Sequence, residues 1–357
     1  MLFIVFAVLM GGWRFNPAAA QEVVKKAIWQ VFLQRDVGDN GADKLTFIDE
    51  ITGDETNVSV QGERYTLAGQ QVIYFDKTVN RVMVAAPDGT VRDHPFIQMG
   101  GDARRVDWLV APDSSLIAWT LTGGTSDALN TTTTLANLDG TNPRQVLIDG
   151  PRNAIRALPV AFSVDKSFLY MDFQPDGVGG FTPFPQFAGL FSLDLATGAQ
   201  NYLPGEPGCF CGAALNDGLF LRLSVAKDLS GFDLKVVNLS GAVVQTIPAL
   251  ALANYTQAGD VVISPDGSKA VYAVAQIRDF GTANQSVRTV FMLVDLELMT
   301  QAPLTDPITT FVEPLAWTED DTAVIFTSRQ RDGTWKINLS DGKLDKVANA
   351  TYLGKLG

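Results

Sequence analysis

The sequence predicts an all-β protein built from repeated four-stranded units, and three observations predict it. After residue 20, short apolar or alternating runs of about 5–8 residues dominate, rich in Val, Ile, Thr, Phe and Tyr. Gly, Pro, Asp and Asn separate these runs. Two kinds of tight turn alternate along the chain, and like turns lie about 36–58 residues apart. Four short strands at this spacing are typical of a β-propeller blade, so the sequence predicts a seven-bladed propeller with about 48 residues per blade.

The first kind of turn carries glycine between two strands. Glycine accepts a positive φ, so an X-Gly pair is a natural hairpin corner. A seventh corner, without glycine, is expected at Glu297–Thr300. The six glycine corners contain Gly53, Gly89, Gly140, Gly198, Gly241 and Gly342.

The second kind of turn resembles a known repeat. The runs VDWLVAPDSSLIAWT, ISPDGSKAVYAV and LAWTEDDTAVIFTSRQRDGTWKINLSDGKLDKVA are similar to the TolB-like, or WD40-like, propeller repeat. The resemblance extends over residues 27–348 and is clearest in the third, sixth and seventh units. It implies the propeller fold and says almost nothing about activity, because the same fold serves scaffolds and enzymes.

The two ends of the repeat region suggest how the ring closes. The last unit has four runs, at 314–318, 323–328, 334–338 and 343–347, whereas the first has only three, at 27–34, 44–49 and 56–60. We predict that residues 350–355 supply the innermost strand of blade 1, since this would pair edges that are otherwise open. A disordered tail beside a three-stranded first blade is the alternative.

The N-terminus is typical of an exported protein. Residues 2–10 (LFIVFAVLM) are apolar, and three alanines at 18–20 precede Gln21, which matches a signal peptide cleaved after Ala20, although no basic residue precedes the run. The run is too short to span a bilayer, which takes roughly 20 apolar residues. We therefore expect residues 1–20 to be a signal peptide, or else a retained hydrophobic segment. Residues 21–357 are expected to form one propeller domain in the periplasm, at the cell surface or outside the cell.

Composition excludes several kinds of function. The 39 acidic residues outnumber the 27 basic ones, giving a net charge of −12, which disfavours nucleic-acid binding. The chain has one histidine, His94, and two cysteines, so His₃, Cys₄ and Cys₂His₂ metal sites are excluded. No G-x-S-x-G motif accompanies His94, for which we expect a surface or packing role. The sequence thus predicts no cofactor, no metal site and no identifiable catalytic residue.

Four arginines lie on two neighbouring links between predicted blades. Arg104 and Arg105 lie in the link at 93–105, and Arg152 and Arg156 lie in the link at 148–158. If these links meet at the channel mouth, the four guanidinium groups would hold an anionic ligand or an acidic segment of a partner. The alternative is that each arginine pairs with a local carboxylate, such as Asp102, Asp107 or Asp149.

A long loop at 174–189 carries phenylalanines among prolines. Such an apolar loop would form a protein-contact surface or would fold back onto its own blade. The candidates for contact are Phe181, Phe184 and Phe187.

Two kinds of covalent modification are suggested by short motifs. Cys209 and Cys211 are a disulfide candidate in an exported chain, although a one-residue gap makes a strained ring, and two buried thiols are the alternative. Seven N-x-[ST] sequons would accept glycans only where an exported chain meets a glycosylation system. They begin at Asn57, Asn130, Asn238, Asn254, Asn284, Asn338 and Asn349.

These features predict a non-catalytic exported propeller that acts as a protein-interaction platform or accessory subunit in the cell envelope or outside the cell. Its partners would be proteins, and it would neither bind nucleic acid nor span a membrane fully. One alternative is a propeller enzyme, a lyase or hydrolase of glycans or peptides, in which the arginines, His94 and Asp102 act at the channel mouth. The other is a surface protein that assembles with itself.

Overall fold

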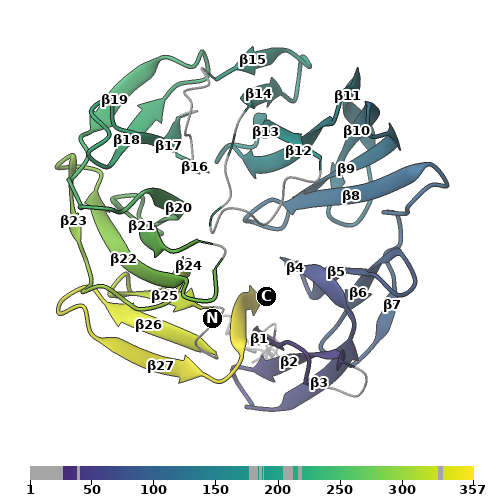
Figure 1. The fold of residues 1–357 in the computed structure, drawn as a ribbon. Helices are drawn as coiled ribbons and strands as arrows, with labels where there is room; N and C mark the ends of the chain where they lie inside the picture. Colours follow the sequence, from purple (N-terminus) through teal and green to yellow (C-terminus); the bar gives the residue numbers. More distant parts are fainter. Residues whose placement is uncertain are drawn as a thin grey trace, which may run out of the picture.

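Seven four-stranded antiparallel sheets stand as blades around a central channel (Figure 1). The structure, a computed structural model, describes residues 27–37, 41–176, 184, 187, 189–203, 212–215, 219–280, 282–328 and 333–357. The seven-bladed propeller predicted from the turn spacing and the TolB-like repeats is confirmed. Within the described part of the chain, no helix is long and apolar enough to cross a membrane.

Each blade runs from an innermost strand at the channel to an outermost strand at the outer edge of the ring. The strands of each blade are given from inside to outside. Blade 1 consists of β28 (Thr351–Leu356), β1 (Trp29–Gln34), β2 (Asp43–Asp49) and β3 (Glu55–Val60). Blade 2 consists of β4 (Gly62–Ala68), β5 (Gln71–Asp76), β6 (Arg81–Ala85) and β7 (Val91–Asp93). Blade 3 consists of β8 (Ala103–Val110), β9 (Leu116–Thr125), β10 (Ala128–Asn137) and β11 (Arg144–Arg152). Blade 4 consists of β12 (Ile155–Phe162), β13 (Phe168–Pro175), β14 (Leu190–Asp194) and β15 (Gln200–Tyr202). Blade 5 consists of β16 (Gly212–Ala214), β17 (Phe220–Val225), β18 (Phe232–Val237) and β19 (Val243–Ile247). Blade 6 consists of β20 (Gln257–Ile263), β21 (Lys269–Arg278), β22 (Ser286–Asp295) and β23 (Thr300–Pro303). Blade 7 consists of β24 (Glu313–Trp317), β25 (Ala323–Thr327), β26 (Thr334–Asn338) and β27 (Leu344–Ala348).

The glycine corners connect the third and fourth strands of the blades. All six predicted glycines have a positive φ, between 66° and 86°. At the corner predicted without glycine, Met299 takes the same left-handed conformation, with a φ of 59°. The backbone of this corner is therefore constant while its residue type varies, which is why turn chemistry reveals the repeat more clearly than residue identity does.

The second kind of turn connects the first and second strands, and an aspartate holds it together. In blade 6 the Asp266 carboxylate accepts hydrogen bonds from the Ser268 amide at 2.9 Å and from the Ser264 hydroxyl at 2.6 Å. The Ser264 oxygen in turn accepts the Lys269 amide at 2.9 Å. The same arrangement recurs at the corresponding turns of blades 4 and 7. These repeated aspartates therefore stabilise turns, and their recurrence marks the fold.

The C-terminal strand closes the ring. β28 pairs antiparallel with β1, so that Trp29 lies opposite Leu356 and Leu33 lies opposite Thr351. Leu356 is only 1 % exposed and belongs to the hydrophobic cluster between blades 1 and 2. The predicted closure by residues 350–355 is confirmed, with the strand shifted by one residue.

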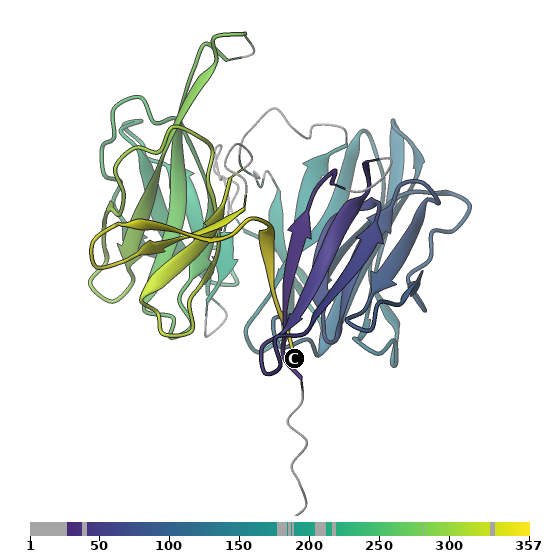
Figure 2. The ribbon, with the colours of Figure 1, turned by 90° about the horizontal axis from the view of Figure 1, so that it is seen from below.

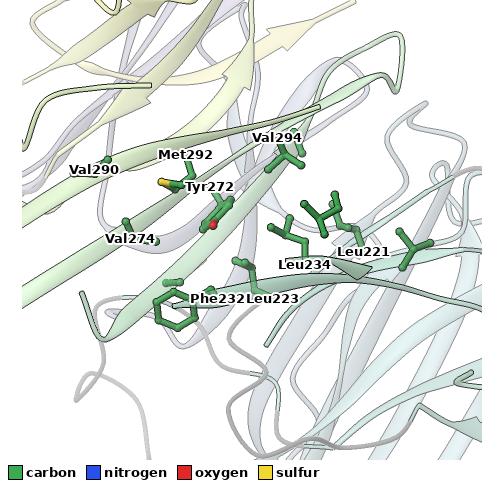
Figure 3. Packing of buried hydrophobic residues seen from close by; sticks show 13 residues of the cluster. Leu221, Leu223, Phe232, Leu234, Tyr272, Val274, Val290, Met292 and Val294 are labelled. Carbon is green, nitrogen blue, oxygen red and sulfur yellow. The ribbon is translucent and has the colours of Figure 1, made fainter. Parts of the chain in front are cut away.

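Hydrophobic clusters hold neighbouring blades together. Figure 3 shows the cluster between blades 5 and 6, where Leu221 and Leu234 meet Tyr272 and Met292. Similar clusters join blades 1 to 2, 2 to 3, 3 to 4, 4 to 5 and 6 to 7. Each blade is a twisted sheet, and the burial of apolar side chains between neighbouring sheets fixes the position of each blade in the ring.

The tight turns lie on one face of the ring. The connections between blades and the turns between second and third strands, which we call the long links, lie on the other face. The C-terminus, at the lower edge of Figure 2, marks the face of the tight turns, and the β21–β22 hairpin projects from the other face. The segment 148–158, expected to be a link between blades, is mostly strand, because it contains the end of β11 and the start of β12.

We predict that Gly354→Ala weakens ring closure. Gly354 has a φ of +128°, and a Cβ there would lie 2.5 Å from Cδ1 of Leu67. The variant should lose about 2 kcal/mol of unfolding free energy, measured by chemical denaturation. Gly357→Ala is the control, because its Cβ would make only an ordinary contact at 3.7 Å. Equal stability of the two variants would contradict the importance of this position.

Candidate functional site

Four arginines gather where the innermost strands of blades 2, 3 and 4 begin. These strands start at the face of the long links, so their first residues surround the mouth of the channel. We call this group the arginine rim, and it consists of Arg64 on β4, Arg104 and Arg105 on β8, and Arg156 on β12.

Asp107 is the inner anchor of the arginine rim. Its Oδ1 accepts a hydrogen bond from Nη1 of Arg64 at 3.0 Å, and its Oδ2 accepts one from Nη1 of Arg156. Nη1 of Arg64 also donates to the Val106 carbonyl, and Nε of Arg64 lies 3.8 Å from Oε1 of Glu63. One carboxylate thus ties together arginines from two blades that flank its own.

Asp176, directly after β13, is the outer anchor. Its carboxylate lies 3.3 Å from Nη1 of Arg105, 3.7 Å from Nη2 of Arg104 and 3.8 Å from Nε of Arg156. Among the described residues, the four guanidinium groups of the rim lie within 4 Å of three carboxylates, those of Glu63, Asp107 and Asp176. The rim carries a net positive charge in a chain whose overall charge is −12.

Burial divides the rim into two parts. The Arg156 side chain is 9 % exposed, whereas those of Arg104 and Arg105 are each 43 % exposed. Burial lowers the pKa of Arg64, and the charge of Asp107 opposes that change, so Arg64 stays protonated as arginines in proteins do. Arg156 and Asp107 form a fixed, largely buried base, whereas Arg104 and Arg105 present their charge to solvent.

The structure brings three of the four predicted arginines together and leaves one apart. Arg152, at the end of β11, makes a bidentate pair with Asp149 at 2.6 and 2.8 Å and stacks 4.1 Å from the centroid of Phe173. Local pairing, the alternative stated for each arginine, describes Arg152 well. Arg156 pairs with Asp107, one of the predicted partners. Arg104, Arg105 and Arg156 all lie near Asp176, a partner that the sequence did not suggest.

Arg64 is the rim residue that the sequence analysis missed. It is the third residue of its innermost strand, as Arg105 is, and Arg156 is the second of its own. Aligning these three strands as repeats would have found it. Asp176 gives no such signal, because it is 71 residues from Arg105 and meets it only in the folded ring.

The phenylalanines of the 174–189 segment point into the protein where they are described. Phe184 is 2 % exposed and packs in the cluster between blades 6 and 7, with its ring 6.4 Å from that of Phe311. Phe187 is half-buried against the clusters of blades 4–5 and 5–6. Their segment leaves blade 4, so Phe184 packs on blades other than its own. Phe181 lies outside the described residues.

The modification motifs have different surroundings. Cys209 and Cys211 lie outside the described residues. Asn238 and Asn338 are half-buried and bonded, since Oδ1 of Asn238 accepts two backbone amides and Nδ2 of Asn338 donates to Asp345 at 3.1 Å. The exposed sequon asparagines are Asn57, Asn130, Asn254, Asn284 and Asn349.

His94 is a packing residue. It follows β7, is 2 % exposed, and lies edge-on to the ring of Phe96 at 4.5 Å. Its Nδ1 accepts the amide of Ile97 at 3.0 Å. Among the described residues, no group of three or more His, Cys, Asp or Glu side chains could hold a metal ion.

We predict that removing the inner anchor destabilises the ring. Asp107→Ala would leave Arg64 and Arg156 without their shared carboxylate, and the loss for a buried charge is about 3 kcal/mol of unfolding free energy. Asp93→Ala is the control, because its pair with Arg81 is exposed on both sides and should contribute less than about 1 kcal/mol. Chemical denaturation of both variants measures the difference, and similar losses would contradict the role of Asp107.

We predict that His94 makes stability depend on pH. Burial lowers its pKa from the ordinary 6.5 to about 4, so the unfolded chain takes up a proton between these values while the native protein does not. Unfolding free energy should therefore fall as pH drops from 6.5 towards 4, by about 3 kcal/mol at most. His94→Asn keeps an acceptor for the Ile97 amide and should flatten this dependence. Because the chain has one histidine, an unchanged slope in the variant would refute the assignment.

Comparison with known proteins adds support for the fold. No protein-family model matches the sequence, and no curated protein does. Among solved structures, a prolyl endopeptidase is 12 % identical, with a TM-score of 0.59 over 90 % of this chain and 50 % of its own. A puromycin-hydrolyzing peptidase from Mycobacterium tuberculosis is 14 % identical, with a TM-score of 0.59 over 94 % of this chain and 53 % of its own. TolB from Acinetobacter baumannii is also similar, at 16 % identity and a TM-score of 0.40 over 79 % of this chain and 63 % of its own.

The chain spans about half the length of the two peptidase chains. At such low identity the likeness concerns architecture, because one propeller fold carries many functions. Architecture, blade count and closing strand together establish that this chain is a seven-bladed β-propeller.

Proposed function

We propose that this protein is a non-catalytic, exported β-propeller that binds other proteins, as an interaction platform or accessory subunit in the cell envelope or outside the cell. The observation that carries the proposal is the arginine rim. It places a net positive charge on the face of the ring where the innermost strands begin, and loops of a rigid scaffold often carry function.

The rim suits an acidic segment of a partner protein. Arg156 and Asp107 form a buried base, so Arg104 and Arg105 stand on a rigid support while half of each side chain meets solvent. Guanidinium groups bind carboxylates bidentately, and preorganisation lowers the entropic cost of binding. A local positive mouth on an acidic protein would also orient an acidic partner as it approaches.

Export is the second part of the proposal. Residues 1–20 would be removed as a signal peptide, leaving residues 21–357 as one propeller domain. In that compartment Cys209 and Cys211 would be able to form a disulfide, and the exposed sequons would be open to glycosylation. The mass of the intact native protein would report cleavage, disulfide and glycans together.

An enzyme is the less supported alternative. The only imidazole in the sequence is His94, which is buried at the outer end of blade 2 with Nδ1 engaged. Acid–base chemistry at the channel mouth would thus fall to carboxylates such as Asp102 and to the arginines. Self-assembly is a further alternative, and the molecular mass in solution would detect it.

We predict that the protein captures a partner from the native envelope through the exposed part of the rim. The double variant Arg104→Gln/Arg105→Gln should lose the partner, since it removes two charges whose loss leaves the buried base in place. Capture should also weaken as ionic strength rises. Affinity capture followed by mass spectrometry gives the readout.

The matched control is Arg81→Gln/Arg92→Gln, which removes two exposed arginines from the outer strands β6 and β7. It should capture the partner as the unchanged protein does. Equal capture by both double variants, or recovery of free monomer alone, would contradict the proposal.

A further inference from the structure

The interface between blades 5 and 6 ends in a pocket. The hydrophobic cluster of Figure 3 fills this interface, but at the face of the tight turns its last side chains border a space of about 450 Å³. This volume falls within the usual range for ligand sites, roughly 300–1,000 Å³.

The walls of the pocket are mostly aliphatic. Leu215 and Leu219 flank the turn between the first two strands of blade 5, and Val236 lies on β18 of the same blade. Ile263 and Leu296 come from blade 6. All five belong to the cluster between blades 5 and 6 or pack against it, and we call the space that they line the blade 5–6 pocket. None of the described residues that line it carries a charge.

One repeat position with a small side chain accounts for much of this space. The position is the last residue of an innermost strand, directly before the serine or threonine of the turn that an aspartate holds. In blades 4 and 7 this residue is aromatic, and it fills the interface with the preceding blade, since Phe162 is 4 % and Trp317 is 8 % exposed. In blade 6 it is Ile263, which is smaller and only half-buried.

A second repeat position shows the same difference. The amides of Leu195 and Leu296, which follow the third strands of blades 4 and 6, donate to the Ser167 and Ser268 carbonyls, each at 2.9 Å. Leu195 is 5 % exposed between blades 3 and 4, whereas Leu296 is half-buried and lines the pocket. Because the backbone bonds are the same in both blades, the pocket arises from the side chains that surround it.

The frame of the pocket is held by bonded turns. The Leu215 amide donates to the Leu219 carbonyl at 2.8 Å, which keeps these two leucines side by side. Val164, in the corresponding turn of blade 4, is 58 % exposed and adds a wall from a third blade. A ligand would therefore meet apolar surface that is already formed, and binding to it would order few side chains.

Negative charge surrounds the mouth of the pocket. Asp165, Asp266 and Glu297 are exposed, and each is adjacent in the sequence to a residue that lines the pocket. Hydrogen bonds from Ser264 and Ser268 lower the pKa of Asp266 to about 2, so this carboxylate is charged at neutral pH.

The lysines of the same turns do not cancel this charge. Lys166 and Lys269 are half-buried, and Lys166 is paired with Asp113. The mouth of the pocket therefore favours a cationic ligand and disfavours an anionic one, such as a fatty acid.

We propose that the blade 5–6 pocket binds an aliphatic side chain of a partner protein, on a segment in which lysine or arginine flanks that side chain. The apolar walls bury the aliphatic group, and the carboxylates of Asp165, Asp266 and Glu297 pair with its basic neighbours.

This surface is separate from the arginine rim. The pocket opens among the tight turns, whereas the rim lies at the face where the innermost strands begin. The inference therefore goes beyond the proposed function, because one propeller would hold an acidic segment on one face and a basic, aliphatic segment on the other.

The test titrates the whole protein, isotopically labelled at the methyl groups of Ile, Leu and Val, with the capped hexapeptides KKLLKK, KKSSKK and EELLEE. The NMR signals of the methyl groups report both affinity and location. KKLLKK should shift the signals of Leu219, Ile263 and Leu296, whereas KKSSKK should not, since it offers charge without an apolar side chain. EELLEE should bind about tenfold more weakly than KKLLKK, because its charges and those of the mouth repel each other.

Ile263→Trp gives blade 6 the residue type that blade 7 has at this position, so it should fill the pocket and weaken KKLLKK binding about tenfold, or 1.4 kcal/mol. Ile148→Trp is the matched control, because Ile148 is 73 % exposed on β11 of blade 3, and this variant should bind KKLLKK as the unchanged protein does. If Ile263→Trp does not fold, Val164→Ser decides, since it should weaken binding while its control Val79→Ser, at a valine that is 51 % exposed on blade 2, should not.

Absence of KKLLKK binding, or equal binding of KKLLKK and either control peptide, would overturn the inference. Unchanged binding by a folded Ile263→Trp variant, or signal shifts confined to residues outside the pocket, would do the same. Arg104→Gln/Arg105→Gln should bind KKLLKK normally, so failure of the rim to capture a partner and failure of the pocket to bind the peptide are separate results.

Discussion

The antiparallel pairing of β28 with β1 is the constraint on which the rest of the structure depends. Six interfaces between blades are filled by hydrophobic clusters, and such clusters alone would leave a ring with two free ends. By supplying the innermost strand of blade 1 from the end of the chain, the protein couples its last blade to its first through backbone hydrogen bonds. Closure therefore depends on directional backbone hydrogen bonds as well as on apolar burial.

The closed ring explains how charge is arranged on this molecule. Innermost strands begin and β13 ends at the same face of the ring, so polar side chains near these points meet at the channel mouth even when 49 or 71 residues separate them. Glu63, Asp107 and Asp176 are three carboxylates beside four arginines, which leaves a small positive excess.

Several residues with reactive or apolar side chains prove to be structural. His94 fills the outer part of the interface between blades 2 and 3, the aspartates of the SPDG-type turns bind backbone amides, and Phe184 completes a core in a distant part of the ring. In each case the buried or bonded state follows from satisfying polar groups and excluding water within a repeating scaffold.

Local patterns in the sequence predicted most of the strands, both kinds of turn, the number of blades and the closing strand, because these depend on local backbone preference and on the period of apolar residues. They also placed Arg104, Arg105, Arg152 and Arg156 on two neighbouring links between blades, and the structure shows that Arg104, Arg105 and Arg156 lie at the starts of two innermost strands. The folded ring settles that Arg152 pairs with Asp149, three residues before it, and not with the rest of the rim. It also brings Asp176 to the rim and Phe184 to blades 6 and 7. The contacts of Asp176 and Phe184 join residues far apart in the chain, so no local pattern encodes them.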